Sequence, residues 1–252
     1  MGSFKDVFQR IELKYLMDDD QYNALRERLQ GMAEVDSYGE TSILNIYFDT
    51  PDYKLIRRSL EKPIYKEKLR LRSYGIPKDD TTSFIEIKKK YKGIVYKRRI
   101  GMPYEQSLAY LVDGEPVAKQ SQISNEINYF MSFYKGIAPA MAISYDRIAM
   151  AGVEDPELRI TFDRNIRWRT ENLDLKYGNV GNEILQPGQH LMELKIAGAI
   201  PMELAHILDE LNIRKTSFSK YGKGYEQMMQ QKLVAERENK VEYLKKGDRI
   251  SA

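Results

Sequence analysis

The sequence contains no cysteine and only two histidines among its 252 residues. The lack of cysteine excludes disulfide bonds, thiolate zinc sites and cysteine nucleophiles. With only two histidines, few imidazole groups are available for acid-base catalysis or metal binding. Any catalysis by this chain therefore relies on Lys, Arg, Asp, Glu, Ser, Thr or Tyr side chains.

Long apolar runs are missing as well. No stretch approaches the roughly 20 residues that a membrane-spanning helix needs, and Met1–Phe8 lacks the hydrophobic segment of a secretory signal. Charge of one sign is not in large excess, because 40 basic residues face 37 acidic ones, a balance too even to indicate a nucleic-acid binder. These absences favour a soluble, cytoplasmic protein.

The length favours a single domain over residues 1–252, with a core at about 7–226 and a C-terminal helix with a frayed tail at 227–252. Strands are expected where polar and apolar residues alternate, over 10–17, 42–50, 67–74, 83–90, 93–102, 140–150, 158–168 and 190–196. Helices are expected from apolar spacings of three and four, after the acidic run 18–20 and at 103–112, 124–135, 201–211 and 225–243. Residues 52–62 and 172–188 are expected to be connectors, and Tyr221–Tyr225 a turn before the last helix.

The polar faces of the predicted strands are strongly cationic. Alternate residues of a strand point to opposite faces, so each strand divides into an apolar set and a polar set. The polar sets hold twelve Lys and Arg residues but four carboxylates. They comprise Arg10, Glu12, Lys14, Lys68, Arg70, Arg72, Glu86, Lys88, Lys90, Lys97, Arg99, Tyr145, Arg147, Arg159, Thr161, Asp163, Glu193 and Lys195. The cationic excess of the chain is therefore concentrated on its strands.

Two arrangements are compatible with this pattern. An antiparallel sheet with one solvated face is the simpler one, but such a face normally mixes both charge signs with Ser, Thr and Gln. In the other arrangement, the charged faces converge inside a closed barrel, and the apolar faces point outward beneath amphipathic helices. A lumen lined by about a dozen cations would repel itself when empty and would attract a chain of several phosphates.

The carboxylates fit the second arrangement. A magnesium or manganese ion on a phosphate chain needs only one or two protein carboxylates, because phosphate oxygens and water complete its shell. Glu193 and Glu12 are the candidate metal ligands. Glu86 and Asp163 are expected instead to pair with neighbouring Lys or Arg side chains and to orient them.

A set of short motifs occurs in the order seen in a known family. The motifs are Arg10-Ile-Glu-Leu-Lys14-Tyr15, Tyr47-Phe-Asp49, Lys68-Leu-Arg70-Leu-Arg72, Phe84-Ile-Glu-Ile-Lys88, Lys97-Arg-Arg99, Tyr145-Asp-Arg147, Arg159-Ile-Thr-Phe-Asp163, Glu193-Leu-Lys195 and Ser217-Phe-Ser219-Lys220-Tyr221. This set resembles the VTC domain, the polyphosphate polymerase domain of the vacuolar transporter chaperone complex, which has stand-alone bacterial relatives. The resemblance spans about residues 7 to 226 and places the chain among the triphosphate tunnel metalloenzymes.

The resemblance implies an α+β fold built on a closed, eight-stranded antiparallel β-barrel with a charged lumen and helices outside. It implies transfer of the γ-phosphate of ATP to a growing polyphosphate chain, with Mn2+ or Mg2+ as cofactor. Residues that would grip phosphates during catalysis are Lys14, Arg70, Arg72, Lys88, Lys97, Arg147 and Lys220. Substrate binding is expected from Arg10, Tyr145, Arg159, Lys195 and Ser219, and metal binding from Glu193 and Glu12.

One departure bears on the activity. Tunnel phosphatases and cyclases of the CYTH branch open with Glu-x-Glu-x-Lys, whereas this chain has Arg10 in place of the first Glu. The loss of that carboxylate favours a polymerase over a two-metal hydrolase. A triphosphatase acting on tripolyphosphate or nucleoside triphosphates stays open, as does a non-catalytic binder of polyphosphate or inositol polyphosphate.

A single-stranded nucleic-acid barrel is ranked last. Such barrels interleave aromatic residues with basic ones for base stacking, whereas these faces carry mainly Lys and Arg. We therefore expect no nucleic-acid partner. Whether a membrane partner receives the product stays open.

Overall fold

The protein is described by a computed structural model that covers residues 10–92 and 94–248, with the side chains of 11–92 and 94–240. The Arg10 side chain and the tail at 249–252 lie outside this description. Each range in which alternation or helical spacing predicts a strand or helix contains one, and Gly93, the first residue of the predicted strand 93–102, lies outside the described residues.

The strands are β1 (Arg10–Met17), β2 (Ala33–Asp49), β3 (Tyr65–Tyr74), β4 (Thr82–Tyr91), β5 (Ile94–Pro103), β6 (Ala138–Gly152), β7 (Arg159–Arg169), β8 (Asn182–Glu183), β9 (His190–Ala197) and β10 (Lys215–Thr216). The helices are α1 (Asp19–Arg28), α2 (Lys54–Leu60), α3 (Tyr104–Leu108), α4 (Gln122–Phe133), α5 (Met202–Glu210) and α6 (Lys220–Asp248). A π-helical turn η1 (Ala109–Asp113) and a 3-10 turn η2 (Leu175–Tyr177) complete the set.

Helix α2 lies in the stretch 52–62, which was expected to be a connector. Its first turn is stabilised from outside the helix, because the Asp49 carboxylate accepts hydrogen bonds from the backbone N–H groups of Leu55 at 2.9 Å and Ile56 at 3.0 Å. Unpaired N–H groups at a helix N-terminus favour an acceptor of this kind. The residue that caps α2 thus belongs to the preceding strand.

The predicted turn at Tyr221–Tyr225 is wrong, because these residues form the first turns of α6. The glycines there serve close packing. A Cβ atom on Gly224 would lie 2.8 Å from Met141 Sδ and 3.1 Å from Trp168 Cβ, so only glycine lets the helix approach β6 and β7 this closely.

In the described part of the chain the strands form one ten-stranded antiparallel sheet, in the order β10-β1-β9-β7-β6-β2-β3-β4-β5 with β8 paired to β7. The expected barrel of eight strands therefore needs correction. Two strands of two residues each, β8 and β10, add to the eight predicted ones. The end strands β5 and β10 do not pair with each other among the described residues, so hydrogen bonds do not close the sheet.

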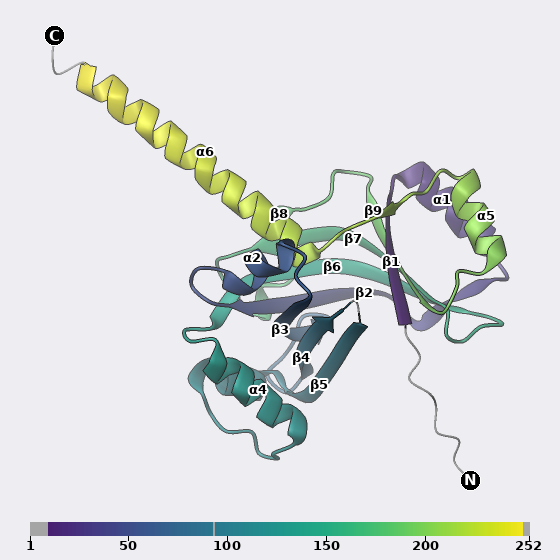
Figure 1. The fold of residues 1–252 in the computed structure, drawn as a ribbon, viewed down its shortest axis with the longest axis horizontal. Coiled ribbons are helices and arrows are strands. Elements are labelled where there is room, and N and C mark those ends of the chain that lie inside the picture. Colours follow the sequence, from purple (N-terminus) through teal and green to yellow (C-terminus); the bar gives the residue numbers. More distant parts are fainter. Residues whose placement is uncertain (1–9, 93, 249–252) are drawn as a thin grey trace.

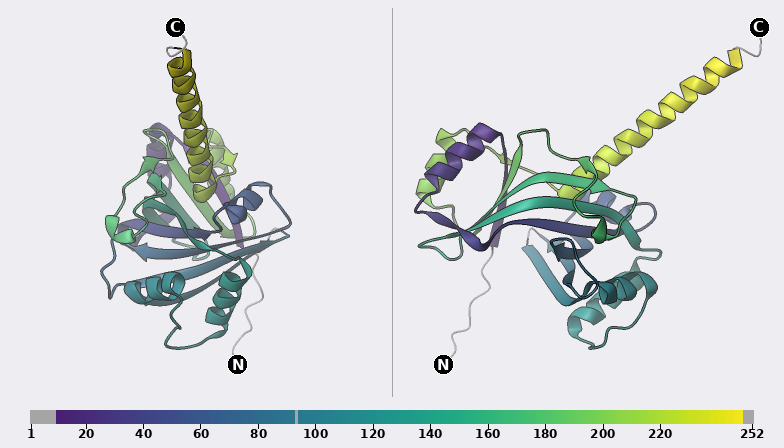
Figure 2. Two further views of the ribbon diagram at one scale, coloured as in Figure 1. Left: turned by 90° about the vertical axis from the view of Figure 1, so that its left-hand side faces the viewer. Right: turned by 180° about the vertical axis from the view of Figure 1, so that it is seen from behind.

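The sheet is nevertheless strongly curved, as Figure 2 shows. Strands β1 and β4 are separated by five strands along the sheet, yet Lys88 Nζ on β4 lies 3.4 Å from Glu12 Oε2 on β1. The polar faces of distant strands consequently face one another across the inside of the curve. We call this concave, ion-rich surface the charged face.

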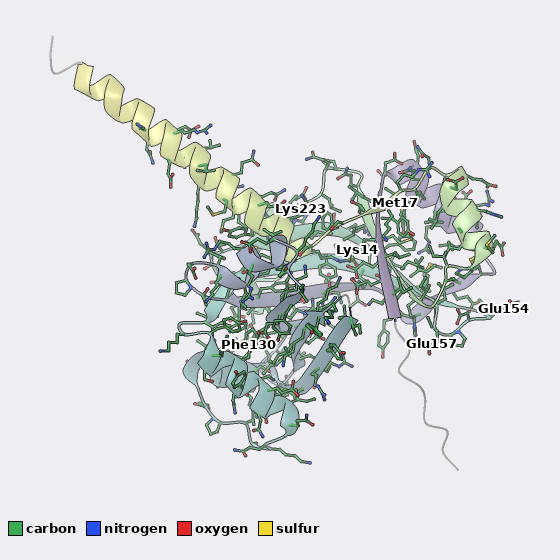
Figure 3. All side chains as sticks on the ribbon, in the orientation of Figure 1. Lys14, Met17, Phe130, Glu154, Glu157 and Lys223 are labelled. Atoms are coloured by element: carbon green, nitrogen blue, oxygen red, sulfur yellow. The ribbon has the colours of Figure 1, made fainter. Side chains whose placement is uncertain are left out.

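The apolar faces of the strands point outward and are covered by helices. At one end of the sheet, α1 and α5 lie side by side over β1, β7 and β9 (Figure 1), with Leu25, Leu194 and Leu204 fully buried between them. Under β3 and β4, the helices α3 and α4 cover Leu71 and Ile87. Figure 3 places Met17 of the first cluster on β1 and Phe130 of the second on α4.

The first turns of α6 pack against a third cluster that includes Ile143, Trp168 and Tyr221, and the rest of the helix projects away from the sheet (Figure 1). Along 10–92 and 94–248, none of the helices combines the length and the apolar character that crossing a bilayer requires. The start of α6 carries Lys220 to the inside of the curved sheet, where it joins the candidate site.

Candidate functional site

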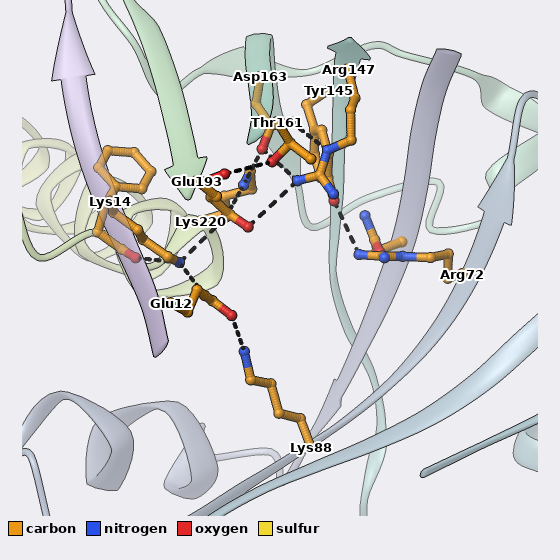
Figure 4. Close-up of polar contacts among 12 residues, drawn as sticks. Glu12, Lys14, Arg72, Lys88, Tyr145, Arg147, Thr161, Asp163, Glu193 and Lys220 are labelled. Atoms are coloured by element: carbon orange, nitrogen blue, oxygen red, sulfur yellow. Dashed lines mark hydrogen bonds and ion pairs between the residues drawn. The ribbon is translucent and has the colours of Figure 1, made fainter. Parts of the chain in front are cut away.

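Glu193 on β9 lies at the centre of the charged face and is surrounded by cations (Figure 4). Its carboxylate lies 2.8 Å from Lys220 Nζ, 3.4 Å from Lys14 Nζ and 3.6 Å from an Arg147 guanidinium nitrogen. The three cations come from α6, β1 and β6. The curved sheet therefore gathers predicted site residues that are far apart in the sequence around one carboxylate.

A second carboxylate, Asp163 on β7, is completely buried and ties two of the same cations together. Arg147 donates two hydrogen bonds to it, at 2.6 and 2.8 Å, and Lys220 Nζ lies 2.5 Å away. The expectation that Asp163 pairs with and orients neighbouring cations is confirmed.

These contacts change the electrostatics of the buried groups. Burial would raise the pKa of the Glu193 carboxyl, but the adjacent cations outweigh burial and hold its pKa well below the ordinary value. Burial would likewise lower the pKa of Lys220, but Asp163 and Glu193 raise it above the ordinary value. Both groups are therefore charged at neutral pH, as buried ions with close partners must be.

Glu12 on β1 lies where the charged face opens to solvent. Its carboxylate contacts Lys14 Nζ and Lys88 Nζ, each at 3.4 Å. Burial raises the pKa of Glu12, but Lys88 and other cations shift the net value below the ordinary one. Because Lys14 Nζ lies 3.4 Å from both Glu12 and Glu193, the two candidate metal ligands converge on one point.

This donor set can be tested against the expected divalent cation. Among the described residues, no three His, Asp or Glu side chains are grouped so that they could enclose a metal ion. Two convergent carboxylates do fit a magnesium or manganese ion that arrives with phosphate oxygens and keeps water in its shell. Glu12 and Glu193 thus suit a metal carried by the substrate.

Arg72 on β3 extends the site toward β2 and β6. Its buried guanidinium donates to Asn45 Oδ1 at 2.8 Å and to the Tyr145 hydroxyl at 3.0 Å. The ring of Tyr145 is in turn faced by Lys220 at 4.6 Å and by Arg147 at 5.1 Å. Tyr145 therefore connects the arginine of β3 to the cations around Glu193.

Glu86 on β4 organises two further predicted cations. Arg70 Nε donates to it at 2.7 Å, and Lys97 Nζ lies 2.6 Å away. Burial raises the pKa of Glu86, but these cations together with Arg72 outweigh it and lower the value to about 2. Glu86 pairs with neighbouring cations, as expected.

Three side chains of the site, those of Asn45, Tyr47 and Lys68, were not among the predicted site residues. The Tyr47 hydroxyl accepts a hydrogen bond from Arg70 at 3.1 Å, and its ring stacks on Tyr221 at 4.6 Å. Burial raises the pKa of Tyr47, but Arg70, Lys68 and another arginine lower it to about 8. The signal was present, because Asn45 and Tyr47 alternate along β2 and face inward like the polar residues of the other strands.

Lys68 is the third addition. Its Nζ donates to the hydroxyl of Ser219, a predicted substrate-binding residue, at 3.2 Å. Burial and neighbouring cations lower the pKa of Lys68 to about 8. The same Ser219 hydroxyl accepts the Gly222 N–H at 3.1 Å, which holds the start of α6 against the site.

The remaining predicted residues lie at the edge of the site. Lys88 and Lys97 line the opening, with side chains 41% and 40% exposed. Arg159 is exposed and pairs in register with Lys195, which is half-buried. Arg159 is thus not brought into the centre, and Arg10 lies outside the described side chains.

Comparison with known proteins assigns this arrangement to a family. The sequence profile described as VTC domain matches residues 9–229, which include every predicted site residue. The chain belongs to the VTC domain family. No curated protein matches the chain.

Solved structures similar to this VTC domain share its fold. A protein from Bacillus halodurans, described as a candidate adenylate cyclase, has a TM-score of 0.53 at 13% identity and covers 84% of this chain and 95% of its own. A protein from Hippeastrum, described as a candidate adenylyl cyclase with a dominant triphosphatase activity, has a TM-score of 0.51 at 16% identity, covering 86% and 95%. At these identities the likeness establishes a shared fold and nothing beyond it.

Proposed function

We propose that this VTC domain is a polyphosphate polymerase that transfers the γ-phosphate of ATP to the end of a growing polyphosphate chain. The observation that carries the proposal is the convergence of Lys14, Arg147 and Lys220, from three separate elements, on one buried point. Cations placed this close stabilise a polyanion between them. The curved sheet would act as the tunnel that encloses the phosphate chain.

The reaction requires two anions to approach each other. An oxygen of the terminal phosphate of the chain attacks the γ-phosphorus of ATP, and a new P–O–P linkage forms. The bond from the γ-phosphorus to the β-phosphate oxygen breaks, and ADP leaves with that electron pair. Phosphoryl transfer of this kind needs in-line positioning and neutralisation of charge more than covalent help from the protein.

The residues of the site supply both requirements. Arg72, Arg147 and Lys220 are held by hydrogen bonds and ion pairs before substrate arrives, so little reorganisation is needed when charge develops. Arg70 and Lys97, oriented by Glu86, would grip the phosphates next to the reacting pair. Tyr145 and Ser219 would add hydrogen bonds from their hydroxyl groups.

Glu12 and Glu193 would hold the divalent cation. When bound, a magnesium or manganese ion supplies positive charge to the phosphate oxygens and orients them. Lys14 Nζ lies 3.4 Å from both carboxylates and offsets the repulsion between their negative charges. Two carboxylates favour one substrate-borne ion, which agrees with transfer more than with two-metal hydrolysis.

Hydrolysis is the second candidate, in which water replaces the chain end as the attacking group. The Hippeastrum protein, which has the same fold, is described as having a dominant triphosphatase activity. The same cations would serve both reactions, because both stabilise charge on the same transferred phosphoryl group.

Product analysis separates the candidates. Purified protein is incubated with ATP and manganese, and separately with tripolyphosphate, and the products are resolved by gel electrophoresis and by an orthophosphate assay. Long chains together with ADP support the polymerase, and orthophosphate alone supports the hydrolase. Tight binding of either anion without any product points to a non-catalytic binder and contradicts both enzymes.

Two variants and a matched control sharpen the assay. Glu193→Ala and Arg70→Ala are expected to abolish product formation. Arg164→Ala removes an exposed arginine that pairs with Glu40 at 2.7 Å outside the site, and its activity is expected to equal that of the unchanged protein. Equal losses in all three variants would indicate damage to the fold instead of the site.

A further inference from the structure

Two aromatic side chains interrupt the ionic lining of the charged face beside Arg72. Phe84 on β4 pairs in register with Arg72 on β3 and, on its other side, with Gly101 on β5. Tyr74 follows Arg72 by two residues on β3 and therefore points to the same face. The two rings meet edge to face, with their centroids 5.8 Å apart. A phenyl ring offers a phosphate neither a hydrogen bond nor a positive charge, so this part of the face suits a different chemical group.

Arg99 on β5 covers the ring of Phe84. Its guanidinium carbon lies 4.7 Å from the ring centroid, which is the geometry of a cation–π contact. Arg99 lies opposite Glu86 in register, but the Glu86 carboxylate contacts Arg70 and Lys97 instead. Over the residues that the structure describes, no carboxylate lies within ion-pair distance of the Arg99 guanidinium. Arg99 is thus placed by an aromatic ring, whereas Arg70 is placed by a carboxylate.

Gly101 allows the ring of Phe84 to lie against the backbone of β5. A Cβ atom on Gly101 would lie 3.2 Å from Phe84 Cε1 and 3.4 Å from Cδ1, so a larger residue would displace the ring. The backbone of Gly101 is not in the left-handed region. Space for the ring, and not backbone conformation, is therefore what requires glycine here.

These side chains are accessible to a ligand, unlike two tyrosines nearer the centre of the site. Tyr74 is 46% exposed, Phe84 is partly exposed and Arg99 is exposed. The rings of Tyr47 and Tyr145 are buried and face other side chains of the protein. A planar ligand can therefore reach the rings beside Arg72 without any rearrangement of the centre.

From this juxtaposition we infer that Tyr74, Phe84 and Arg99 form a binding site for the nucleobase of a nucleoside triphosphate. We call these three residues the aromatic site. Bases stack on aromatic rings and on the guanidinium plane of arginine. Residues directly opposite each other on paired strands have Cβ atoms about 4.5–5.5 Å apart, so the aromatic site begins one strand spacing from Arg72. The ribose would lie between the base and the phosphates held by Arg72 and the cations around Glu193.

The inference rests on the proposed function for the identity of the phosphate donor, but it makes a claim about binding alone. Tripolyphosphate has three linked phosphates, like ATP, but carries no nucleoside. Loss of the stacking surface would therefore weaken binding of a nucleoside triphosphate and leave binding of tripolyphosphate unchanged. If Phe84 only packed the sheet, its loss would affect both anions alike, because both depend on the cations of β3 and β4.

The experiment measures two Kd values by calorimetric titration without divalent metal, so that no reaction occurs. The anions are tripolyphosphate and the β,γ-imido analogue of ATP, whose γ-phosphate resists transfer. Phe84→Leu keeps an apolar side chain but removes the ring, so the Kd for the analogue is expected to rise at least about fivefold. The Kd for tripolyphosphate is expected to change less than about twofold.

Arg99→Lys separates stacking from charge at the same site. The substitution keeps the positive charge but removes the planar guanidinium. The Kd for the analogue is expected to rise about two- to fivefold, and the Kd for tripolyphosphate is expected to stay unchanged. A variant that weakened both anions equally would show that Arg99 acts on phosphate and not on the base.

Tyr96→Leu is the matched control for Phe84→Leu. Tyr96 is an exposed residue of β5 that pairs in register with Lys89, whose side chain contacts Glu126 of α4 on the outer face. Both Kd values are expected to stay unchanged. Thermal unfolding checks the fold of each variant, and Tyr74→Leu, which alters an exposed side chain, replaces Phe84→Leu if the latter does not fold. Equal weakening of both anions, or no weakening of the analogue, overturns the inference.

The outcome is distinguishable from the fate of the proposed function. A protein that only hydrolyses ATP but loses affinity for the analogue in Phe84→Leu contradicts the polymerase and supports the aromatic site. A protein that makes long chains, and whose Phe84→Leu variant binds the analogue as tightly as the unchanged protein, supports the polymerase and overturns the aromatic site. Failure of the unchanged protein to bind the analogue contradicts both.

Discussion

The charged face has two regions that balance their cations in different ways. In the first, which we call the carboxylate region, Glu193 and Asp163 lie between Lys14, Arg147 and Lys220, and the ions neutralise one another. In the second, which we call the lysine region, Lys68 pairs in register with Lys88, Lys88 with Lys97, and Lys66 with Lys90 on β3, β4 and β5. The carboxylate region is preorganised before substrate binds, whereas the lysine region is electrostatically incomplete until an anion arrives.

Under the proposed function, the two regions would have separate tasks. Catalysis of phosphoryl transfer needs charges fixed in advance, because reorganisation during the reaction raises the barrier. Holding a long, uniform polyanion needs many similar contacts and little geometric precision. A comparison of variants in the two regions therefore tests whether cations fixed by carboxylates and cations without such partners have different roles.

The largest effect is expected from Glu193→Gln in the carboxylate region. The substitution leaves Lys220 and its neighbours buried with less negative charge, and breaking a buried ion pair costs about 3–5 kcal/mol of the free energy of unfolding. Product formation is expected to fall at least about a hundredfold. Urea denaturation and the product assay measure the two effects.

Glu183→Gln is the control for this variant, since Glu183 forms an exposed ion pair with Arg167 at 2.9 Å. Its unfolding free energy is expected to change by less than about 1 kcal/mol. If Glu193→Gln behaved like this control, Glu193 would not be the centre of the site.

Arg72→Lys is expected to have the next largest effect. The planar guanidinium donates to Asn45 and Tyr145 at once, and a lysine ammonium does not reproduce that geometry. We expect kcat/KM to fall about ten- to a hundredfold, with a loss of about 1–2 kcal/mol in unfolding free energy. A variant with unchanged kcat/KM would show that Arg72 contributes only its charge.

The lysine region has a characteristic dependence of stability on pH. The pKa of Lys68 is lowered to about 8 in the folded protein from an ordinary value of 10.5. The unfolded chain therefore binds the proton more tightly, and the free energy of unfolding rises as pH increases from about 8 to 10.5. Below pH 8 the protonated Lys68 destabilises the folded state by its full amount.

Lys68→Gln removes this contribution, so its unfolding free energy is expected to rise less over the same range, by on the order of 1–3 kcal/mol. Urea denaturation at pH 7.5 and pH 10 measures the difference. Lys89→Gln serves as the comparison, because Lys89 lies on the outer face of β4, 3.4 Å from Glu126 of α4. If the unfolding free energies of Lys68→Gln and of the unchanged protein rose equally with pH, the pKa of Lys68 would not be lowered in the folded protein.

Tyr47→Phe, at the boundary between the regions, is expected to have the smallest effect. The substitution removes the hydroxyl that accepts from Arg70 but keeps the ring that stacks on Tyr221. Because Glu86 still holds Arg70, kcat/KM is expected to fall only about three- to tenfold. Tyr129→Phe, which alters an exposed tyrosine of α4, is expected to leave kcat/KM unchanged.

Local patterns were sufficient to predict the strands and which of their faces is charged. Alternation along Lys68–Arg72 and Glu86–Lys90 places the cations on one face, and the structure has this face inside the curve. The apolar residues Leu69 and Ile87 lie outside under helices, as the pattern requires. These contacts contradict the simpler alternative, in which the charged residues lie on a solvated face of an ordinary antiparallel sheet.

Features that depend on contacts distant in sequence were not predictable in the same way. The pairing of Lys220 with Glu193 joins residues 27 apart. The cap of helix α2 also comes from outside the helix, from Asp49 six residues before Leu55. The glycines near Tyr221 favour a turn when the sequence is considered alone. In the structure Gly224 instead allows α6 to pack closely against Met141 and Trp168. Closure of the sheet also depends on how its two edges meet, which alternation along single strands does not encode.

The most direct test of the account is a crystal structure of the protein with tripolyphosphate and manganese. The account predicts one phosphate chain inside the curved sheet, contacted at the same time by Arg70 of β3, Arg147 of β6 and Lys220 of α6. A chain bound only on the outer surface, or one contacted by a single strand, would contradict the claim that these distant cations serve one polyanion.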